Sequence, residues 1–517
     1  VESASAVLRV TTPGPVSILE SPPNVTIRAG ETANICMAFG GTPPFAVQMS
    51  RWQNIEWTPI GPRHIFPDNG RHCIATPVLQ SADDGAEFLF LGANDEGGIV
   101  EAMTRIVTVT VTSQAVVTNT TLASRSTSGV TANNRSGLPS LSADGSIVAF
   151  ISDGTNLVPG FVGSAFTAGN AYVRDLSTGV TTLVNVTPAG TQSQSPYGVI
   201  GLKLAAGGRH AIFSSLAGDL VADDTNGSQD VFVRDLQTGV TTRVSLHADG
   251  SQITGAGNSQ FDMQVNISED GRFVSFVSNQ DLIGSDGPGG YSLYLYSRQT
   301  GFMQRVTSGP SPVGYSTMSA NGEHLAYRDA TFAPDRNFIV HFDAEAGVLE
   351  EVFSIDSSNN VSYLAQGVSI SDDGRYIAFA LRSPTTFNGS LFTQIMAIDR
   401  NNPGNITVAS GDSNGFGNGH SIHPEVSDDG HVLFMTNAGS LTSDFANSQI
   451  TALVVRDLHT TDLSVASRRA DGSSIAILGG YAYHAISRDG SVVAFAADEF
   501  DMSGGAREYQ VYVAPRP

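Results

Sequence analysis

The sequence lacks any apolar run that could cross a membrane. Of its 517 residues 40% are hydrophobic, yet no stretch approaches the roughly 18–20 consecutive apolar residues of a transmembrane helix. Long runs of strong helix formers are also missing, whereas Gly (55 residues), Ser, Thr, Asn and Asp are plentiful. This composition favours many short strands joined by turns. The length exceeds one ordinary core, so we expect two domains, or one domain and a large array of repeats.

Positive charge is scarce. The formal net charge is −22, and Lys203 is the only lysine in the chain. A surface of this sign repels the phosphates of nucleic acids and of anionic membranes, so we expect neither as a partner. The acidic excess is typical of a solubilising surface, and the use of Arg in place of Lys is typical of a genome that favours Arg codons.

Cysteine is limited to Cys36 and Cys73. One pair in an acidic, turn-rich chain indicates an oxidising compartment and a disulfide between the two, with two buried free thiols as the alternative. The first residues, VESASAVLRV, lack the basic and apolar regions of a signal peptide, so we interpret the chain as a mature or trimmed product. We expect an extracellular or cell-surface bacterial protein, with the periplasm as a further option.

One phrase occurs seven times, at intervals of about 50–63 residues. In each copy a polar turn ends in Gly, which adopts positive φ readily, and a strand rich in β-branched and aromatic residues follows. A period of this size indicates an array of supersecondary units. The copies are SADGSIVAF (142–150), AGGRHAIF (206–213), SEDGRFVSF (268–276), SANGEHLAY (319–327), SDDGRYIAF (371–379), SDDGHVLFM (427–435) and SRDGSVVAF (487–495).

Each unit has the pattern of four short strands. Seven such units predict a seven-bladed β-propeller over residues 117–517. The last unit lacks its fourth strand, whereas NTTLASRSTSG (119–129) resembles the fourth-strand phrases of other units. We therefore expect residues near 119–126 to pair with the last blade and close the ring, which removes two exposed strand edges.

These motifs resemble the WD40-like propeller repeats of the TolB family, whose pattern is Ser-Pro-Asp-Gly followed by Ile-Ala-Phe and a downstream Asp. The resemblance covers residues 117–517, although Pro is missing from every turn and Gly207 stands where Asp is expected in the second unit. It implies the propeller fold rather than one activity.

Residues 16–115 resemble an immunoglobulin-like β-sandwich. In this resemblance Phe88 stands at the tyrosine-corner position, Phe90 at the second Cys and Met49 at the core Trp. The usual disulfide is then not available, and Cys73 falls on a strand beside that of Cys36. Residues 1–15 resemble the last strand of a preceding domain of the same kind. We favour truncation of a longer tandem protein, with a donor strand for self-association through residues 1–13 as the alternative.

Two clusters are candidate chemical sites. The first places hard oxygen ligands around Gly227, as Ca²⁺ requires, with an ion-free Asx-rich turn as the alternative; its residues are Asp223, Asp224, Asn226 and Asp230. The second is a set of histidines expected at the channel, which could bind a transition metal or act as general bases, with water-bonded channel residues as the alternative. It comprises His420, His423 and His484, with Tyr481 and Tyr483 beside the last.

The longer loops are expected on one face of the propeller, where a rigid ring presents variable segments to ligands. They are 152–170, 214–229, 279–290, 382–391, 410–423 and 437–449. We expect a binding or scaffold protein that uses this face, with Tyr481, Tyr483, His420 and His423, to hold a protein or glycan. The alternatives are an extracellular polysaccharide lyase or hydrolase centred on the histidines, and a structural subunit of a surface assembly joined through its first strand.

Overall fold

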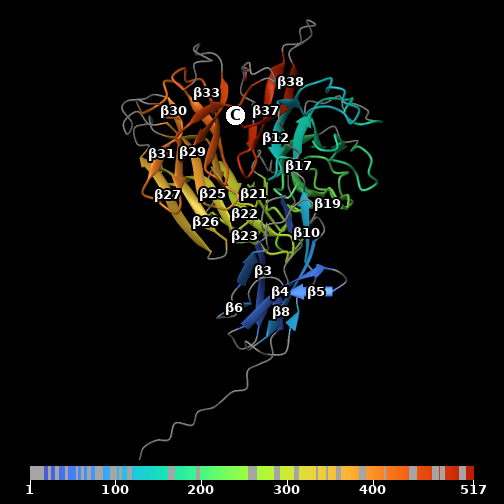
Figure 1. The fold of residues 1–517 in the computed structure, drawn as a ribbon. Coiled ribbons are helices and arrows are strands. Elements are labelled where there is room, and N and C mark those ends of the chain that lie inside the picture. The colour runs from blue at the N-terminus through green and yellow to red at the C-terminus, as the bar shows by residue number, and fades with distance from the viewer. Residues whose placement is uncertain are drawn as a thin grey trace, which may run out of the picture. The chain divides into compact units, whose positions relative to one another are not determined.

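Strands make up all the regular structure in the part of the chain that the computed structural model describes (Figure 1). The all-β prediction is therefore confirmed. No helix long and apolar enough to span a membrane lies in this part. The chain divides into two compact units, Val1–Gln114 and Ala115–Pro517. The described residues are 17–20, 25–28, 34–40, 45–53, 56–59, 63–66, 71–75, 86–93, 102–103, 107–112, 119–160, 169–193, 198–253, 265–284, 291–307, 314–333, 336–344, 347–356, 363–382, 392–412, 415–441, 451–468, 475, 477, 484–499 and 508–516.

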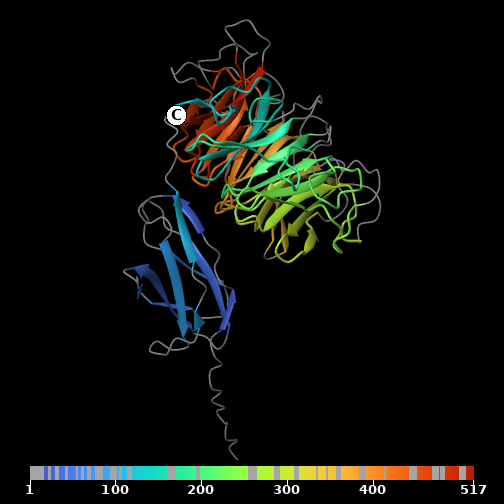
Figure 2. The ribbon, with the colours of Figure 1, turned by 90° about the vertical axis from the view of Figure 1, so that its right-hand side faces the viewer.

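The first unit contains two sheets, seen as the blue elements of Figure 2. One has the strand order β1-β3-β7, and the other β2-β10-β8-β4-β5, with β6 on β4 and β9 on β8. All its pairings are antiparallel except that of β2 with β10. The strands are β1 (Ser17–Glu20), β2 (Val25–Arg28), β3 (Asn34–Gly40), β4 (Phe45–Gln53), β5 (Glu56–Pro59), β6 (His64–Phe66), β7 (Arg71–Ala75), β8 (Ala86–Ala93), β9 (Ala102–Met103) and β10 (Val107–Thr112).

The residues singled out in the first unit lie on paired strands. Met49 of β4 is opposite Phe90 of β8, and both are buried with Phe88. Cys36 of β3 is directly opposite Cys73 of β7. Residues that face one another in an antiparallel pair have Cα atoms about 4.5–5.5 Å apart, which lies within the range that a disulfide bridges. The disulfide itself stays a prediction.

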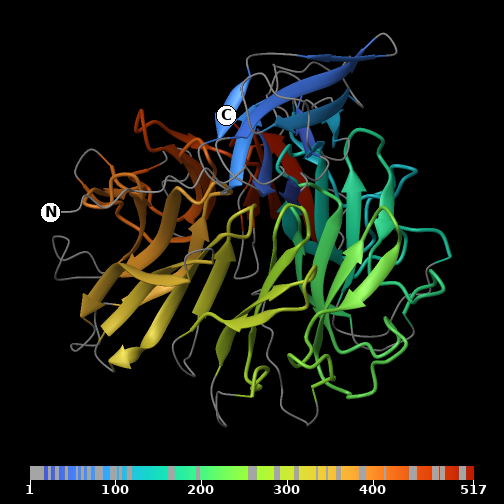
Figure 3. The same ribbon diagram turned by 90° about the horizontal axis from the view of Figure 1, so that it is seen from below.

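The second unit contains seven four-stranded antiparallel sheets, which Figure 3 shows arranged radially. This is the β-propeller architecture. In six sheets the strands follow the order of the chain: β12 (Ser136–Leu141) to β15 (Thr181–Leu183) through β13 (Ile147–Ser152) and β14 (Asn170–Asp175); β16 (Val199–Leu204), β17 (His210–Ser215), β18 (Asp230–Asp235) and β19 (Val240–Arg243); β20 (Asn266–Ile267), β21 (Phe273–Ser278), β22 (Ser292–Ser297) and β23 (Met303–Arg305); β24 (Gly314–Met318), β25 (His324–Ala333), β26 (Arg336–Asp343) and β27 (Val348–Asp356); β28 (Tyr363–Ile370), β29 (Tyr376–Arg382), β30 (Thr393–Asp399) and β31 (Ile406–Val408); β32 (Ser421–Val426), β33 (His431–Thr436), β34 (Ala452–Asp457) and β35 (Leu463–Val465).

The seventh sheet joins the two ends of this unit. Its order is β11 (Thr121–Leu122), β38 (Glu508–Pro515), β37 (Val492–Glu499) and β36 (His484–Ile486). Thr121 is opposite Val513, and the pairing continues where the Ala123 N–H donates to the carbonyl of Val511 at 2.7 Å. The expected pairing of residues near 119–126 with the last sheet is thus observed for Thr121–Ser124, and β38 has a neighbour on both sides.

The recurrent Ser-x-Asp-Gly phrase forms a hydrogen-bonded turn between the first two strands of a sheet. In the copy at 371–374 the Ser371 hydroxyl donates to Asp373 Oδ1 at 2.6 Å and accepts from the N–H of Tyr376 at 2.9 Å. Gly374 has a φ of 76°, and a Cβ added there would lie 2.2 Å from the His324 ring. Since only glycine tolerates both conditions without strain, the repeat retains it. The Ser bonds recur in five of the other six turns.

The strands that follow these turns are buried on both faces, which explains their fully apolar runs. All six residues of β17 and the first six of β29 are buried. Each core cluster spans two neighbouring sheets; one of them unites Val148 of β13 with Ala494 of β37 and Val511 of β38. The packing therefore continues from the last sheet to the first without a break.

Candidate binding site in the central channel

The innermost strands form a closed ring. Each contacts the next in the order β12, β16, β20, β24, β28, β32 and β36, and β36 contacts β12 again. Backbone hydrogen bonds join the turns of neighbouring sheets along the same ring: the N–H of Ala143 donates to the carbonyl of Ala206 at 2.7 Å, and the N–H of Arg488 donates to the carbonyl of Ala143 at 3.0 Å. These two bonds fix the turns of three adjacent sheets relative to one another.

A cavity of about 190 Å³ lies at the centre of this ring. It is lined by residues of all seven innermost strands and of the turns that follow them. The volume far exceeds the roughly 10–15 Å³ that a single water needs. Two sets of positions repeat around the ring, and all of their members except Glu269, Asp428 and Ser369 line the cavity. The turn layer, the second residue of each turn, comprises Ala143, Ala206, Glu269, Ala320, Asp372, Asp428 and Arg488; the strand layer, three residues earlier, comprises Ser140, Lys203, Asn266, Thr317, Ser369, Glu425 and Ala485.

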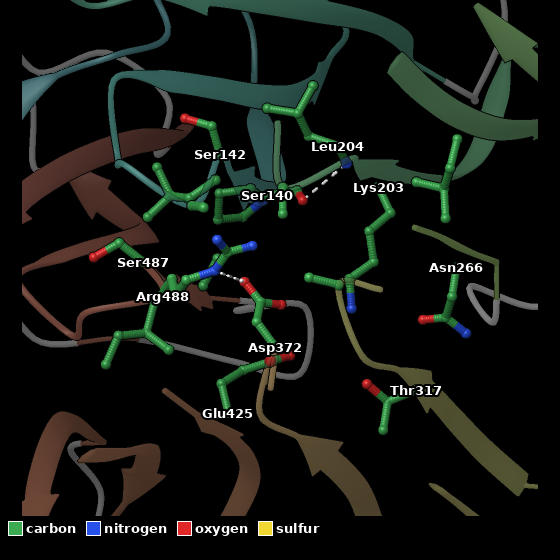
Figure 4. A pocket seen from close by; sticks show the side chains of 18 of the residues that line it. Ser140, Ser142, Lys203, Leu204, Asn266, Thr317, Asp372, Glu425, Ser487 and Arg488 are labelled. Carbon is green, nitrogen blue, oxygen red and sulfur yellow. Dashed lines mark hydrogen bonds and ion pairs between the residues drawn. The ribbon is translucent and has the colours of Figure 1, made fainter. Parts of the chain in front are cut away.

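Arg488 crosses the turn layer. Its Nη2 lies 2.8 Å from Glu269 Oε2 and its Nε lies 3.1 Å from Asp372 Oδ2 (Figure 4), with Asp428 Oδ2 at 3.7 Å. Glu269 follows β20 and Asp372 follows β28, two sheets that do not adjoin that of Arg488, whereas Asp428 follows β32 of the adjacent sheet. Arg488 therefore links separate sheets at the turn end of the channel, and we call these four residues the Arg488 cluster.

The Arg488 cluster changes the acidity of its members. Burial opposes the charged form of Arg488, but the carboxylates of Asp372, Glu269 and Asp428 outweigh this effect and hold its pKa above the ordinary value. Burial raises the pKa of Asp428 to about 8; the charge of Asp372 adds to this rise and that of Arg488 opposes it. One guanidinium cannot satisfy three carboxylates, so a proton on Asp428 relieves the repulsion.

We expect Asp428→Asn to stabilise the protein at high pH. The folded-state pKa of Asp428, about 8, lies above the ordinary value of about 3.9. The stability that protonated Asp428 contributes is therefore fully present below about pH 3.9 and is lost as the pH rises through about 8. Asn cannot titrate, so the variant avoids this loss. With the side chain 24% exposed, we expect a gain of about 1–2 kcal/mol at pH 9 and little at pH 5. Urea unfolding from pH 5 to pH 9 measures both.

The neighbouring residue provides the control with the opposite sign. Burial opposes ionisation of Asp429, but hydrogen bonds from His431 and Ser427 outweigh it and lower the Asp429 pKa. Asp429→Asn should therefore lose stability at neutral pH and regain it on acidification. Equal pH profiles for the two variants would contradict the assignment of the Asp428 proton.

The strand layer carries one positive and one negative side chain. Lys203 lies on β16 and Glu425 on β32, and Figure 4 shows both directed into the same space. Burial raises the pKa of Glu425, and the charge of Lys203 together with a 3.3 Å hydrogen bond from the Ser369 hydroxyl opposes that rise. Lys203 is half-buried, and among the described residues its ammonium has no hydrogen-bond or ion-pair partner. A half-buried ammonium without a partner is a candidate ligand contact.

Sequence reasoning did not select Lys203, Glu425 or the Arg488 cluster. A signal was present: Lys203 is the only lysine of the chain, and all these residues stand at fixed offsets from the repeated turn. The offset alone did not show that these two positions face the channel, because the innermost strand contains a bulge. The register shifts between Ile422 and Glu425, for example.

The three selected histidines are not gathered in the cavity. His484 lines it, whereas His420 and His423 do not. His420 is exposed and accepts a hydrogen bond from the Thr393 N–H at 3.2 Å. His423 has a φ of 53°, as Leu138 does at the same offset from its turn, so it occupies a repeated bulge.

No group of three or more His, Cys, Asp or Glu side chains is placed to hold a metal ion among the described residues. The histidine-ligated metal centre therefore gains no support here. Tyr481 and Tyr483 lie outside the described residues, as do residues 1–13 and large parts of the loops expected to form the ligand face. The described cavity reaches the opposite end of the channel, where the Ser-x-Asp-Gly turns lie.

The guanidinium of Arg243, which lies on β19 outside the expected calcium loop, contacts two of the loop's carboxylates. Arg243 Nη1 lies 3.1 Å from Asp224 Oδ1 and 3.6 Å from Asp230 Oδ2, and all three side chains are buried. Asn226 donates to Asp230 Oδ2 at 2.8 Å, whereas Asp223 is exposed and accepts from Arg243 through its carbonyl. Arg243 thus supplies the positive charge that the sequence suggested for Ca²⁺, and calcium binding stays an untested prediction.

Comparisons with known proteins give fold similarity only. No protein-family model and no curated protein matches the sequence. Similar solved structures include an oligogalacturonate lyase in complex with manganese (13% identity, 74% of this chain and 90% of that chain, TM-score 0.45). The β-propeller domain of the Trilobed protease from Pyrococcus furiosus is also similar (11%, 74% and 95%, TM-score 0.44), as is a putative TolB from Agrobacterium tumefaciens (13%, 53% and 80%, TM-score 0.33).

Proposed function

We propose that this protein is a secreted or cell-surface binding protein whose propeller channel holds a small polar ligand. The seven sheets are the blades of one closed ring, and the first unit is an immunoglobulin-like spacer. The observation that carries the binding role is the cavity inside the ring, in which the ammonium of Lys203 has no partner among the described residues. Ligand sites are concave and place a few polar groups at fixed positions, and this cavity has both properties.

A binding role fits the geometry better than catalysis does. An acid–base centre needs its groups within hydrogen-bond reach of one substrate, and of the three histidines His484 alone lines the cavity. The Arg488 cluster links sheets of the ring and so has a structural role. The loop-rich face remains a second proposed surface, for a protein or glycan, because variable loops on a rigid ring are suited to recognition.

We expect Lys203→Gln to weaken ligand binding at least tenfold. Gln keeps hydrogen-bonding capacity but removes the charge, so loss of affinity reports an electrostatic contact with Lys203. The measurement is a thermal-shift screen of the full chain against small sugars, sugar acids and amino acids, followed by calorimetric titration of each compound that stabilises it. The matched control is Arg135→Gln, which removes a cation whose side chain is 62% exposed.

The outcomes separate the two roles. Binding that Lys203→Gln weakens and Arg135→Gln leaves unchanged supports the channel site. Binding that neither variant alters, or the absence of any ligand, argues against it. Turnover of acidic polysaccharides that His420→Ala and His423→Ala abolish would establish the enzyme instead.

A further inference from the structure

The two charges of the strand layer stand on opposite walls of the channel. Between β16, which carries Lys203, and β32, which carries Glu425, lie three innermost strands on one side (β20, β24 and β28) and two on the other (β36 and β12). Neither side chain forms an ion pair with another described residue. Among the described residues, the carboxyl group of Glu425 accepts one hydrogen bond, from the Ser369 hydroxyl. A ligand in the cavity therefore meets the ammonium of Lys203 on one wall and the carboxyl group of Glu425 on the other.

The remaining charges near the cavity are engaged with one another. Arg488 is surrounded by Glu269, Asp372 and Asp428 in the turn layer. Its guanidinium is consequently unavailable to a ligand carboxylate, and the carboxylate of Asp372 is occupied by Arg488. Lys203 and Glu425 remain as the cation and the anion that can contact a ligand.

The rest of the strand layer is neutral. Two of its groups are occupied: the Ser140 hydroxyl accepts the N–H of Leu204 at 3.0 Å, and the Asn266 amide donates to the Ser275 hydroxyl at 3.2 Å. Ala485, on the strand next to that of Glu425, contributes no polar side-chain group. The layer thus provides one contact for each sign of charge across a small cavity.

We propose that the channel ligand is a small zwitterion, with its carboxylate on Lys203 and its ammonium on Glu425. An amino acid has this form. A ligand with one charge would leave either Lys203 or Glu425 desolvated without a partner, which is unfavourable in a confined site. An ammonium beside Glu425 also favours the ionised form of that carboxyl, so that ligand and site reinforce each other. This inference rests on the proposed channel-binding function.

The test is a series of compounds that differ in charge at their two ends. Glycine, 4-aminobutyrate and 6-aminohexanoate vary the separation of ammonium and carboxylate, and butyrate and butylamine carry one charge each. Titration calorimetry of the full chain should show one of the three zwitterions binding at least tenfold more tightly than butyrate and butylamine. Lys203→Gln and Glu425→Gln should each remove at least tenfold of that affinity.

Charge reversal makes the test specific. Lys203→Glu creates two negative walls, so that variant should prefer 1,4-diaminobutane. Glu425→Lys creates two positive walls and should prefer succinate. The double variant Lys203→Glu/Glu425→Lys should recover the zwitterion, which binds in the reverse orientation. Since reversed charges can unfold the ring, urea unfolding of each variant accompanies the titrations, and the two Gln variants replace any that does not fold.

The outcomes test the zwitterion proposal separately from the proposed channel-binding function. Equal binding of zwitterions and singly charged compounds, or a preference that charge reversal or the Gln substitutions leave unchanged, overturns the zwitterion. If a sugar or sugar acid binds in a Lys203-dependent manner and no zwitterion does, the zwitterion is overturned while channel binding stands. If none of these compounds binds, both fail.

Discussion

Arg243→Met should lower the free energy of unfolding by about 3–5 kcal/mol at pH 7, the largest effect expected for a single substitution here. Removal of one member of a buried ionic group leaves uncompensated charge in the interior. Arg243, Asp224 and Asp230 have side-chain exposures of 8%, 2% and 0%. Met keeps most of the volume, so the loss reports charge rather than a cavity. Urea unfolding measures it.

The pH dependence of this loss follows from the two carboxyls. Burial raises the pKa of Asp224 and of Asp230, and Arg243 opposes both rises. Without Arg243 the values rise further, so the variant loses stability more steeply than the wild type as the pH rises, and its deficit narrows toward pH 5. The variant with Asp224→Asn and Asp230→Asn added should recover most of the loss.

Arg209→Met is the matched control, because Arg209 pairs with Asp235 in the same sheet but is 49% exposed. We expect a loss of about 0–1 kcal/mol. Equal losses for Arg243→Met and Arg209→Met would contradict the buried-charge argument. Calcium should leave the wild-type unfolding midpoint unchanged while Arg243 stands between the aspartates; a calcium-dependent rise would show that the loop binds the ion as the sequence suggested.

Ala123→Asp should destabilise the protein by about 3–5 kcal/mol through the closure of the ring. Ala123 is fully buried among residues of the first and last sheets, and its backbone continues the pairing of β11 with β38. A carboxylate at this position would be buried without a partner. Val130, which is exposed and lies seven positions farther along the chain, provides the control: Val130→Asp should change stability by at most about 0.5 kcal/mol.

Hydrogen exchange tests whether closure is the reason. If β11 holds the edge of the last sheet, the backbone amides of β38 from Glu508 to Ala514 should exchange faster in Ala123→Asp than in the wild type under conditions where both are folded. Unchanged protection of that strand, despite a loss of stability, would show that the substitution acts through local packing alone.

The repeat was readable in the sequence because its determinants are local. Each Ser-x-Asp-Gly turn is specified by bonds within six residues, from Ser371 to Tyr376 in one copy, and by the positive φ of its Gly. The apolar runs after the turns indicate strands that are buried on both faces of their sheet. The similarity of residues 119–129 to the fourth-strand phrases predicted the closure of the ring, because a strand that completes a sheet must carry the pattern of the equivalent strands in the other sheets.

The candidate site was not readable in the same way. The histidines were selected for their chemistry, but the bulge at His423 decides which side chains of β32 face the channel, and the pattern did not show it. The loop at 223–230 has the composition of a cation site, yet the cation is Arg243, which lies outside the loop on β19.

The sequence by itself determined the all-β character, the repeated turn, the approximate extent of each sheet and the strand that closes the ring. These features depend on contacts between residues near in the chain or on a repeated pattern. Only the tertiary structure decided that Lys203 and Glu425 face each other, that Arg488 spans the channel, and that Arg243 neutralises two aspartates. The first two depend on side chains of separate sheets, whose positions are fixed by the geometry of the whole ring. The third depends on the fold of a single sheet, which brings Arg243 of β19 beside Asp224 and Asp230.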